Sequence, residues 1–237
     1  MQNQLSLEKI SVSYSGKEII KDFTWIFKSQ GVTVLLGRSG CGKSTLIKAI
    51  AGLVEHQGAI NNNTKEQSIV FQEPRLIPWL TVSENILQFA QLKKQFISKQ
   101  KIEQILSDVG LTEAKNLYPH QLSGGMKMRT ALARALIVKT RLLLLDEPFS
   151  ALDEPTRYQL GQLLLKLKDQ FAVTIIMVSH QIEESLALAD EVILIDHGKI
   201  KNSYSLKNIK NNIPYYENIE LMKIAQNLRN NYLEATL

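Results

Sequence analysis

GRSGCGKS, residues 37–44, is the stretch of sequence that decides the fold, because it matches the phosphate-binding pattern G-x-x-x-x-G-K-[ST]. A continuous apolar run, Val32 to Leu36, precedes it and predicts a strand buried on both faces. The segment STLIKAIAGL follows, and its apolar residues recur at helical spacing. A strand, a glycine-rich turn and a helix in this order predict a site for the phosphates of a nucleoside triphosphate. The alternative is a glycine-rich turn that binds no ligand.

The residue types in this turn suit a triphosphate. Glycines let successive backbone N–H groups turn inward, and a helix that begins near Lys43 adds the positive end of its dipole. Lys43 is expected to reach the β- and γ-phosphates, and the Ser44 hydroxyl is expected to ligate Mg²⁺. The residues expected to contact the nucleotide here are Gly37, Arg38, Ser39, Gly40, Cys41, Gly42, Lys43, Ser44 and Thr45.

Cys41, inside the turn, is the only cysteine of the chain, which excludes an internal disulfide and fits a reducing cytosol. The inward N–H groups and Lys43 predict a thiol that ionises more readily than that of an ordinary cysteine. The alternative is a side chain that points away and packs as a small group.

The composition is that of an ordinary globular protein, with 44% apolar and 22% charged residues. The N-terminus lacks the basic-then-apolar pattern of a signal peptide. The longest apolar stretches, such as Leu142 to Leu145, are far shorter than the roughly 20 residues of a membrane span. The net charge of +5 is compatible with nucleic acid or anionic lipid, but the basic residues are scattered, and no nucleic-acid partner is expected.

The order of patterns along the chain predicts an α/β fold with a parallel core. Leu5 to Gly31 alternates apolar and polar residues and breaks at Gly16, which predicts antiparallel strands at the start. Buried-strand patterns recur in LLLL (142–145) and VTIIMV (173–178), and they alternate with helical patterns.

The segments between these strands are predicted to be helical or loop-like. Residues from about Val82 to Val109 read as helix, with Ser83 and Ser98 as candidate N-caps. The polar stretch 61–65 reads as a loop, and residues 219–233 read as an amphipathic helix. Between residue 198 and that helix the sequence is polar and rich in asparagine.

Two further motifs carry candidate chemistry. Asp146 and Glu147 follow a buried strand, where Asp146 could hold the hydration shell of Mg²⁺ and Glu147 could polarise the attacking water. The alternative is that they only solvate the strand end. LSGGM (122–126) precedes a helical run and is either a second anion-binding helix start or an ordinary one.

The whole set of motifs resembles the ATPases of the ABC transporter family. LSGGM resembles the family's signature, PFSALD its D-loop with Asp153, and VSH its switch histidine, His180. Gln72 is similar to the glutamine that senses Mg²⁺ and the γ-phosphate, and Tyr14 to the aromatic that stacks on adenine. Taken singly, Tyr14 could be a core residue and His180 a structural one. The order of the motifs along about 200 residues supports the resemblance.

The resemblance implies a composite site, and its residues differ from the family in two places. ATP with Mg²⁺ is expected between two copies of the chain, with Ser123, Gly124 and Gly125 of one copy capping the γ-phosphate bound to the other. Many members carry glutamine where this chain has Met126, and an acidic residue where it has Gln181. The set implied to bind ATP or metal is Tyr14, residues 37–45, Gln72, residues 123–125, Asp146 and Asp153, with Glu147, His180 and Gln72 as catalytic residues.

FQEPRLIPWLTVSENI (71–86) is similar to the importer ATPases of the nitrate, sulfonate and taurine group, some of which serve thiamine-precursor pyrimidines. The resemblance implies an ATPase that powers import of a small solute through a separate permease, fed by a solute-binding protein. It also implies a peripheral position on the cytoplasmic face of the membrane. The alternatives are an exporter subunit or a non-transport ABC ATPase that acts on nucleic acid.

One ABC ATPase domain is expected over residues 1–237. Its predicted parts are a β-rich part with the phosphate loop (1–71), a helical subdomain (about 73–135), the rest of the core (about 136–200) and a C-terminal tail (about 201–237). Within the second part, Leu76, Ile77, Trp79 and Leu80 form an apolar cluster around Pro78. This cluster is either core or a groove for a short cytoplasmic helix of the permease.

Overall fold

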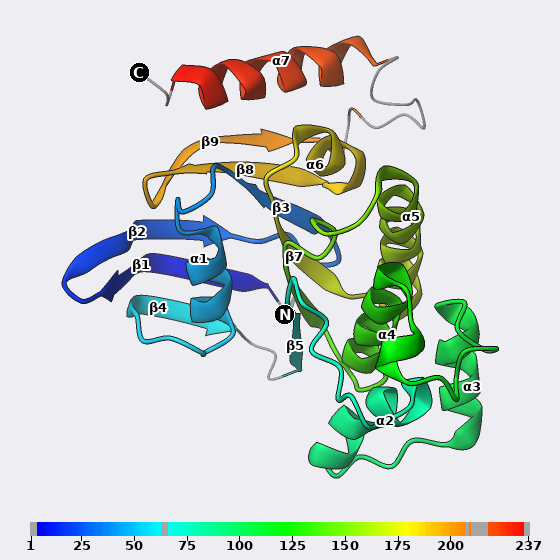
Figure 1. The fold of residues 1–237 in the computed structure, drawn as a ribbon. Helices are drawn as coiled ribbons and strands as arrows, with labels where there is room; N and C mark the ends of the chain where they lie inside the picture. Colours follow the sequence, from blue (N-terminus) through cyan, green and yellow to red (C-terminus); the bar gives the residue numbers. More distant parts are fainter. Residues whose placement is uncertain (1–3, 63–65, 207–208, 210–217, 235–237) are drawn as a thin grey trace. The chain divides into compact units, whose positions relative to one another are not determined.

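The computed structural model describes residues 4–62, 66–206, 209 and 218–234. The chain forms two compact units: Met1–Lys65 with Thr174–Leu237, and Glu66–Val173. Unit 1 carries the phosphate loop, and unit 2 carries most of the helices (Figure 1). Within the part of the chain that is described, none of the helices is both long and apolar enough to cross a membrane.

Unit 1 begins with a three-stranded antiparallel sheet in the order β2-β1-β4. The strands are β1 (Leu5–Tyr14), β2 (Lys17–Ile26) and β4 (Gln57–Asn62). Ser15 and Gly16 join β1 to β2 with φ values of 48° and 79°, as a tight hairpin turn requires. The predicted antiparallel pair is confirmed. The predicted loop at 61–65 is wrong in its first two residues, because Asn61 and Asn62 pair with β1; residues 63–65 lie outside the described ranges.

The second sheet of unit 1 holds the predicted parallel strands. Both β7 (Thr174–Ser179) and β8 (Glu191–Asp196) pair in parallel with β3 (Val32–Leu36). Every residue of β3 is buried, as its unbroken apolar sequence predicts. A further strand, β9 (Lys199–Ser205), pairs antiparallel with β8. The sequence did not predict β9, because its polar, largely exposed residues read as a continuation of the polar stretch.

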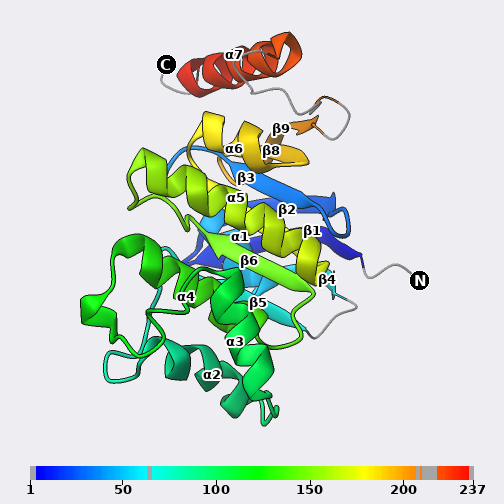
Figure 2. The same cartoon turned by 90° about the vertical axis from the view of Figure 1, so that its right-hand side faces the viewer.

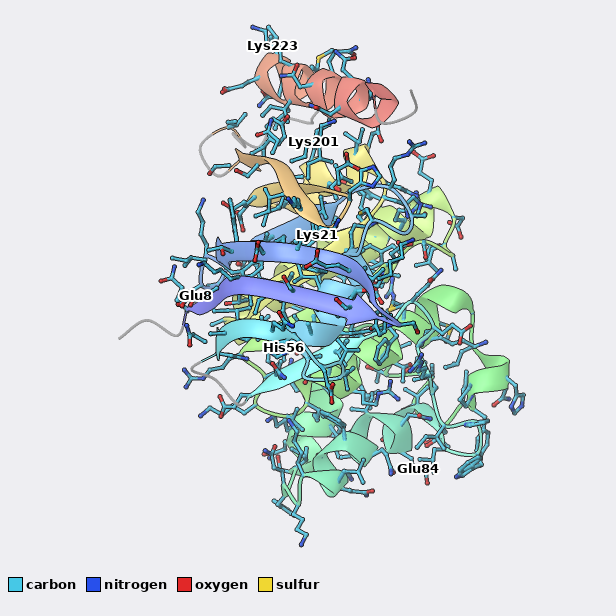
Figure 3. The ribbon with its side chains drawn as sticks, turned by 90° about the vertical axis from the view of Figure 1, so that its left-hand side faces the viewer. Glu8, Lys21, His56, Glu84, Lys201 and Lys223 are labelled. Carbon is cyan, nitrogen blue, oxygen red and sulfur yellow. The ribbon has the colours of Figure 1, made fainter. Side chains whose placement is uncertain are left out.

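The helices of unit 1 are α1 (Lys43–Ile50), α6 (Ile182–Leu188) and α7 (Ile219–Glu234). The amphipathic pattern that predicted α7 is confirmed: Leu221, Ala225 and Leu228 are buried, at helical spacing. Arg229 of α7 forms an ion pair with Glu183 of α6 at 2.7 Å. Lys201 of β9 donates to a backbone carbonyl of α7 at 3.2 Å, and Figure 3 shows its side chain between the two elements.

Unit 2 packs helices beside a parallel pair of strands, β5 (Gln67–Val70) and β6 (Leu142–Asp146). Its helices are α2 (Val82–Leu92), α3 (Lys99–Asp108), the 3-10 turn η1 (Pro119–Gln121), α4 (Gly124–Leu136) and α5 (Glu154–Phe171). Of these, α4 contacts β5, α2 and α5, so it forms the centre of the unit (Figure 2). Met128, Ala131, Leu132 and Ala135 of α4 are accordingly buried.

The helical prediction over Val82 to Val109 is correct in type and wrong in continuity, because residues 93–98 separate α2 from α3. Ser98 caps α3 as predicted and accepts from the Lys101 N–H. Ser83 is not a cap: the N-cap of α2 is Thr81, two residues earlier, and the helix begins at Val82. The Thr81 hydroxyl accepts from the Glu84 N–H, and the Glu84 carboxylate accepts from the Thr81 N–H, which makes a reciprocal capping box. Ser83 could not form such a box, because the residue three positions later is Ile86.

Candidate nucleotide-binding site

The phosphate loop of unit 1 leads from β3 into α1 and is held by its own lysine. Lys43 is 4% exposed, and its Nζ donates to the backbone carbonyls of Gly37 at 2.7 Å and Arg38 at 2.9 Å. Gly42, the N-cap of α1, has φ 105°, a value that a side chain would strain. The first turn of α1 contains no acidic residue, so nothing on the helix itself opposes an anion at its positive end.

Close packing explains why the loop opens with glycine. A Cβ on Gly37 would lie 2.4 Å from the Ile195 carbonyl and 2.8 Å from the Cys41 sulfur. The loop backbone therefore runs directly against the end of β8. The Gly198 N–H donates to the Cys41 carbonyl at 3.1 Å, so the turn after β8 is also bonded to the loop.

The structure corrects the prediction for Cys41. Its side chain is 8% exposed, and burial raises the pKa of the thiol, although the neighbouring Lys43 acts to lower it. Of the alternative, a side chain that points away and packs as a small group, only the packing holds, because the sulfur lies against Gly37 inside the loop. The positive surroundings were read correctly, but burial outweighs them because a thiolate is costly in a dehydrated site.

A cleft of about 620 Å³ opens beside the loop in unit 1. The phosphate loop, the residue after β7 and the turn after β8 line it, through Arg38, Ser39, Gly40, Cys41, His180, Asp196 and His197. The structure thus brings His180 to the phosphate loop, as β3 and β7 are parallel neighbours whose ends lie at one edge.

Asp196 and His197 were missed by the sequence analysis. Asp196 ends the buried strand β8 and His197 follows it, just as Asp146 ends β6 and Glu147 follows it, so the same strand-end signal would have found them. Tyr14 lies at the end of β1 with 46% of its surface exposed, so it is not a core residue. It is not among the residues that line the cleft.

In unit 2, Gln72 and the two acids follow neighbouring strands. Val70 of β5 pairs with Leu145 of β6, so Gln72 and residues 146–147 leave the pair at the same edge. Asp146 is buried, Glu147 is half-buried and Gln72 is exposed.

Glu147 has a left-handed backbone conformation. Its φ of 48° lies in the left-handed region, which a residue with a side chain enters at a cost of about 1 kcal/mol. The Glu147 carbonyl accepts from the Ser150 hydroxyl at 3.0 Å, and this bond fixes the turn. Eight other described residues with a side chain have a similar φ, among them Ser15 and Lys94 in turns, so the backbone alone does not separate a catalytic acid from one that solvates the strand end.

The signature motif forms the start of α4 in unit 2. Ser123 is the N-cap, and its Oγ accepts from the Met126 N–H at 3.2 Å. A Cβ on Gly125 would lie 2.7 Å from the Thr156 side chain, so this glycine allows α4 to approach the start of α5.

Asp153 caps α5 by accepting from the Thr156 N–H and hydroxyl, both at 2.9 Å. The backbone N–H of Thr156 is the main cause of the lowered pKa of the Asp153 carboxyl. Ser123 and Asp153 therefore stand at two adjacent helix N-termini of one unit.

The 74–81 loop, which follows Gln72 and leads into α2, is held by two side chains that the sequence analysis did not identify. Arg134, in the last turn of α4, donates to the carbonyls of Pro74 at 2.7 Å and Arg75 at 2.9 Å. Burial lowers the pKa of this guanidinium. No local motif marks Arg134, because its partners lie about 60 positions earlier in the chain.

Asn85 holds the other end of the 74–81 loop. It is fully buried; its side chain accepts from the Ile77 N–H at 2.7 Å and donates to the carbonyls of Ile77, Leu80 and Thr81. Trp79, between these anchors, is 75% exposed. Of the apolar cluster at residues 76–80, at least the tryptophan is therefore not a core residue. The loop is a fixed platform that presents an indole to solvent.

Comparison with known proteins assigns a family. The family model described as ABC transporter matches residues 20–150. The aliphatic sulfonates import ATP-binding protein SsuB 3 of Pseudomonas syringae pv. syringae (strain B728a) is 39% identical over 204 residues, covering 83% of this chain and 74% of that protein. The taurine import ATP-binding protein TauB of Escherichia coli O157:H7 is 40% identical, covering 82% of this chain and 80% of that protein.

The fold has a counterpart among solved structures. CbiO1 of Clostridium perfringens, described as part of the ABC transporter complex CbiONQ, matches with a TM-score of 0.78 and 24% identity. The match covers 95% of this chain and 98% of that one. The predicted fold class, α/β with a parallel core, an N-terminal antiparallel β part and a helical part, is confirmed.

Proposed function

The chain belongs to the ABC transporter family, and from that premise we propose that it is the ATP-hydrolysing subunit of an importer for a small sulfonate-type solute. The observation that carries the proposal is its 38–40% identity to sulfonate and taurine import ATP-binding proteins over 82–89% of the chain. These relatives favour import over the alternatives of an exporter subunit or an ATPase that acts on nucleic acid. The cargo itself is expected to contact the permease and the binding protein, not this chain.

The proposed nucleotide is ATP with Mg²⁺. The phosphate loop and the positive end of α1 would bind the phosphates, and Tyr14 would stack on the adenine. Ser44 and Asp146 would supply the hard oxygen ligands that Mg²⁺ prefers. Gln72 is proposed as a further oxygen ligand of the same ion. Mg²⁺ is usually held by one or two side chains together with phosphates and water. The described residues contain no cluster of three or more Asp, Glu, His or Cys side chains that could hold a metal ion. A site with few protein ligands still fits Mg²⁺.

The chemistry proposed for the chain needs three of its own groups. Glu147, fixed by the strained turn at the end of β6, would polarise the attacking water. His180, at the edge of the cleft, would contact the γ-phosphate. Lys43 would leave the two carbonyls that it now bonds and neutralise phosphate charge instead.

A second copy of the chain is proposed to complete each site. The start of α4 offers backbone N–H groups and the Ser123 hydroxyl to the γ-phosphate bound by the other copy, with Asp153 nearby on the start of α5. ATP would then join the two copies, and hydrolysis would release them because the group held by α4 is cleaved. All these groups belong to one ABC ATPase domain in this proposal.

The permease is proposed to dock on the 74–81 loop. Arg134 and Asn85 hold its backbone while Trp79 remains exposed, and a rigid aromatic anchor is typical of an interface hot spot. Docking there would attach the chain peripherally to the cytoplasmic face of the membrane. A solute-binding protein would act through the permease, without touching this chain.

The test is reconstitution of the chain with its permease in proteoliposomes. ATP hydrolysis should rise when a sulfonate and its binding protein are present on the opposite side of the membrane, and the sulfonate should enter the ATP-containing compartment. Hydrolysis that responds to no binding protein, with solute moving the other way, would establish an exporter instead. Trp79→Ala should lower co-purification with the permease without lowering the yield of folded chain.

A further inference from the structure

The turn between α2 and α3 exposes apolar side chains in an unusual way. Six consecutive residues, 91–96, are exposed. Phe96 is 93% exposed and Leu92 is 69% exposed. Single exposed apolar side chains are normal, but those that gather at one place typically mark an interaction site. Figure 1 shows the turn at the end of α2 distant from its start, where the 74–81 loop enters.

The same turn carries most of the chain's excess charge. Between Glu84 and Glu103 the sequence contains four lysines and no acidic residue, a net charge of +4 where the whole chain has +5. The lysines are Lys93, Lys94, Lys99 and Lys101, and all are exposed. Lys99 lies 4.0 Å from Glu103, while Lys93 lies over the ring of Phe89 at 4.9 Å. Leu92 to Lys101 is called the basic turn below.

The chemistry of the basic turn distinguishes between possible partners. Protein interfaces are depleted in lysine and enriched in arginine and aromatic residues. The basic turn holds four lysines and a single aromatic residue, Phe96, and no arginine, so its composition is closer to that of a lipid-facing surface than of a protein interface. Nucleic-acid sites need a wider basic face that follows the phosphate backbone. Lysines beside protruding phenylalanine and leucine are typical of surfaces that lie on anionic lipid, because the lysines attract headgroups and the apolar side chains enter the boundary of the acyl chains.

We infer that the basic turn is a contact site for the surface of an anionic lipid bilayer. It gives the chain an attachment to the membrane separate from the permease and from the nucleotide site. The 74–81 loop and the basic turn lie at opposite ends of α2, a helix of 11 residues that spans about 16 Å. The two contacts are therefore close enough for one membrane complex to use both. The inference does not depend on the direction of transport or on the transported solute.

The test measures binding of the purified full chain to extruded vesicles by flotation, with no permease present. The vesicles contain phosphatidylcholine alone or phosphatidylcholine with 30 mol% phosphatidylglycerol. The wild-type chain should bind the anionic vesicles, bind the neutral ones at least tenfold more weakly, and be released by salt. Replacing Lys93, Lys94 and Lys101 by Gln should weaken binding about a hundredfold, at about fivefold per lysine.

Matched variants show whether the effect belongs to the turn. Replacing three exposed lysines elsewhere, Lys17, Lys115 and Lys166, by Gln changes the net charge equally and should weaken binding less than about tenfold. Phe96→Ser should weaken binding about fivefold while leaving its salt dependence unchanged. ATP hydrolysis by every variant should equal that of the wild type, which confirms that each is folded.

Three results would overturn the inference. Equal losses in the two triple variants would mean that net charge alone drives adsorption. Vesicle binding that survives loss of the basic turn's lysines, with assembly on the permease impaired, would make the turn a protein contact. Failure of the wild-type chain to bind anionic vesicles at low salt would exclude a lipid site directly. None of these outcomes affects the ATPase proposal, whose own test is hydrolysis.

Discussion

The phosphate loop and the 74–81 loop each lie between a strand and a helix, but they are held in different ways. The phosphate loop is fixed by its own residues: Lys43 bonds two of its carbonyls, and glycines permit its close turns. The 74–81 loop has no glycine, and one internal bond joins the Leu80 N–H to the Ile77 carbonyl at 3.2 Å. Its backbone is held by Arg134 from α4 and Asn85 from α2.

This difference predicts which substitutions alter each loop. A loop that carries its own supports loses its ligand when one of its residues is replaced. A loop supported from α4 can be altered without a change in its own sequence, and the same helix begins with the signature motif. The 74–81 loop is therefore placed to respond to what happens at the start of α4.

The largest expected effect is on the phosphate loop. Lys43→Ala should weaken ATP binding about a hundredfold, because the ammonium that neutralises phosphate charge is lost. Ser123→Arg should leave ATP binding by the isolated chain nearly unchanged and abolish turnover, since that serine is proposed to act on the nucleotide of the second copy. Equilibrium binding of a fluorescent ATP analogue separates the two. Equal loss of binding in both variants would contradict the composite site.

The next effect concerns the remote support of the 74–81 loop. Arg134→Ala removes two hydrogen bonds and should lower the free energy of unfolding by about 1–2 kcal/mol. Permease-stimulated hydrolysis should fall at least tenfold more than basal hydrolysis. Arg129→Ala is the matched control, because Arg129 also lies on α4 but bonds the Val109 carbonyl instead. Uncoupling by the control to the same extent would show that general weakening of α4 is responsible.

A smaller effect is expected at Cys41. Since burial raises the pKa of its thiol, a bulky maleimide should react with the native chain at least tenfold more slowly than with the urea-unfolded chain at pH 7. The rate is followed by mass spectrometry. Cys41→Ala should remain active, because the loop needs a small side chain there. Fast labelling of the native chain, blocked by Mg-ATP, would restore the prediction of an exposed thiolate.

The smallest effect is at the junction of the 74–81 loop with α2. The Thr81 N–H and hydroxyl hold the pKa of the Glu84 carboxyl below its ordinary value in the folded chain. A depressed folded pKa contributes stability above the unfolded pKa, and this stability is lost as the pH falls through the folded value. Glu84→Gln should therefore be slightly less stable than the wild type in urea at pH 7. The difference should shrink below about pH 4.5; a difference that persists there would contradict the assignment.

Much of the site follows from sequence because its signals are local. The phosphate loop, the acids after β6 and His180 after β7 each stand directly beside a buried strand that is visible as an apolar run. Where long-range contacts decide, sequence reasoning failed. Burial of Cys41 depends on β8, whose end packs against the loop, and the role of Arg134 depends on residues 59 and 60 positions away.

The errors in the fold have similar causes. Among the described strands, β9 pairs with β8 alone, so it is an edge strand whose residues are largely exposed. Its side chains are therefore mostly polar, and no pattern of buried apolar residues marks it in the sequence. The cap of α2 was misplaced because Ser83 and Thr81 are both good caps, and only the reciprocal bond with Glu84 distinguishes them.

The most direct test of the account is the turnover of Glu147→Gln. The substitution keeps the size of the side chain and removes its charge, so ATP binding should equal that of the wild type. Hydrolysis should fall at least a hundredfold, the scale of losing a general base, and the variant should accumulate as an ATP-bound dimer in size-exclusion chromatography. Wild-type turnover by the variant, reconstituted with its permease, would contradict the assignment of Glu147 and with it the proposed site.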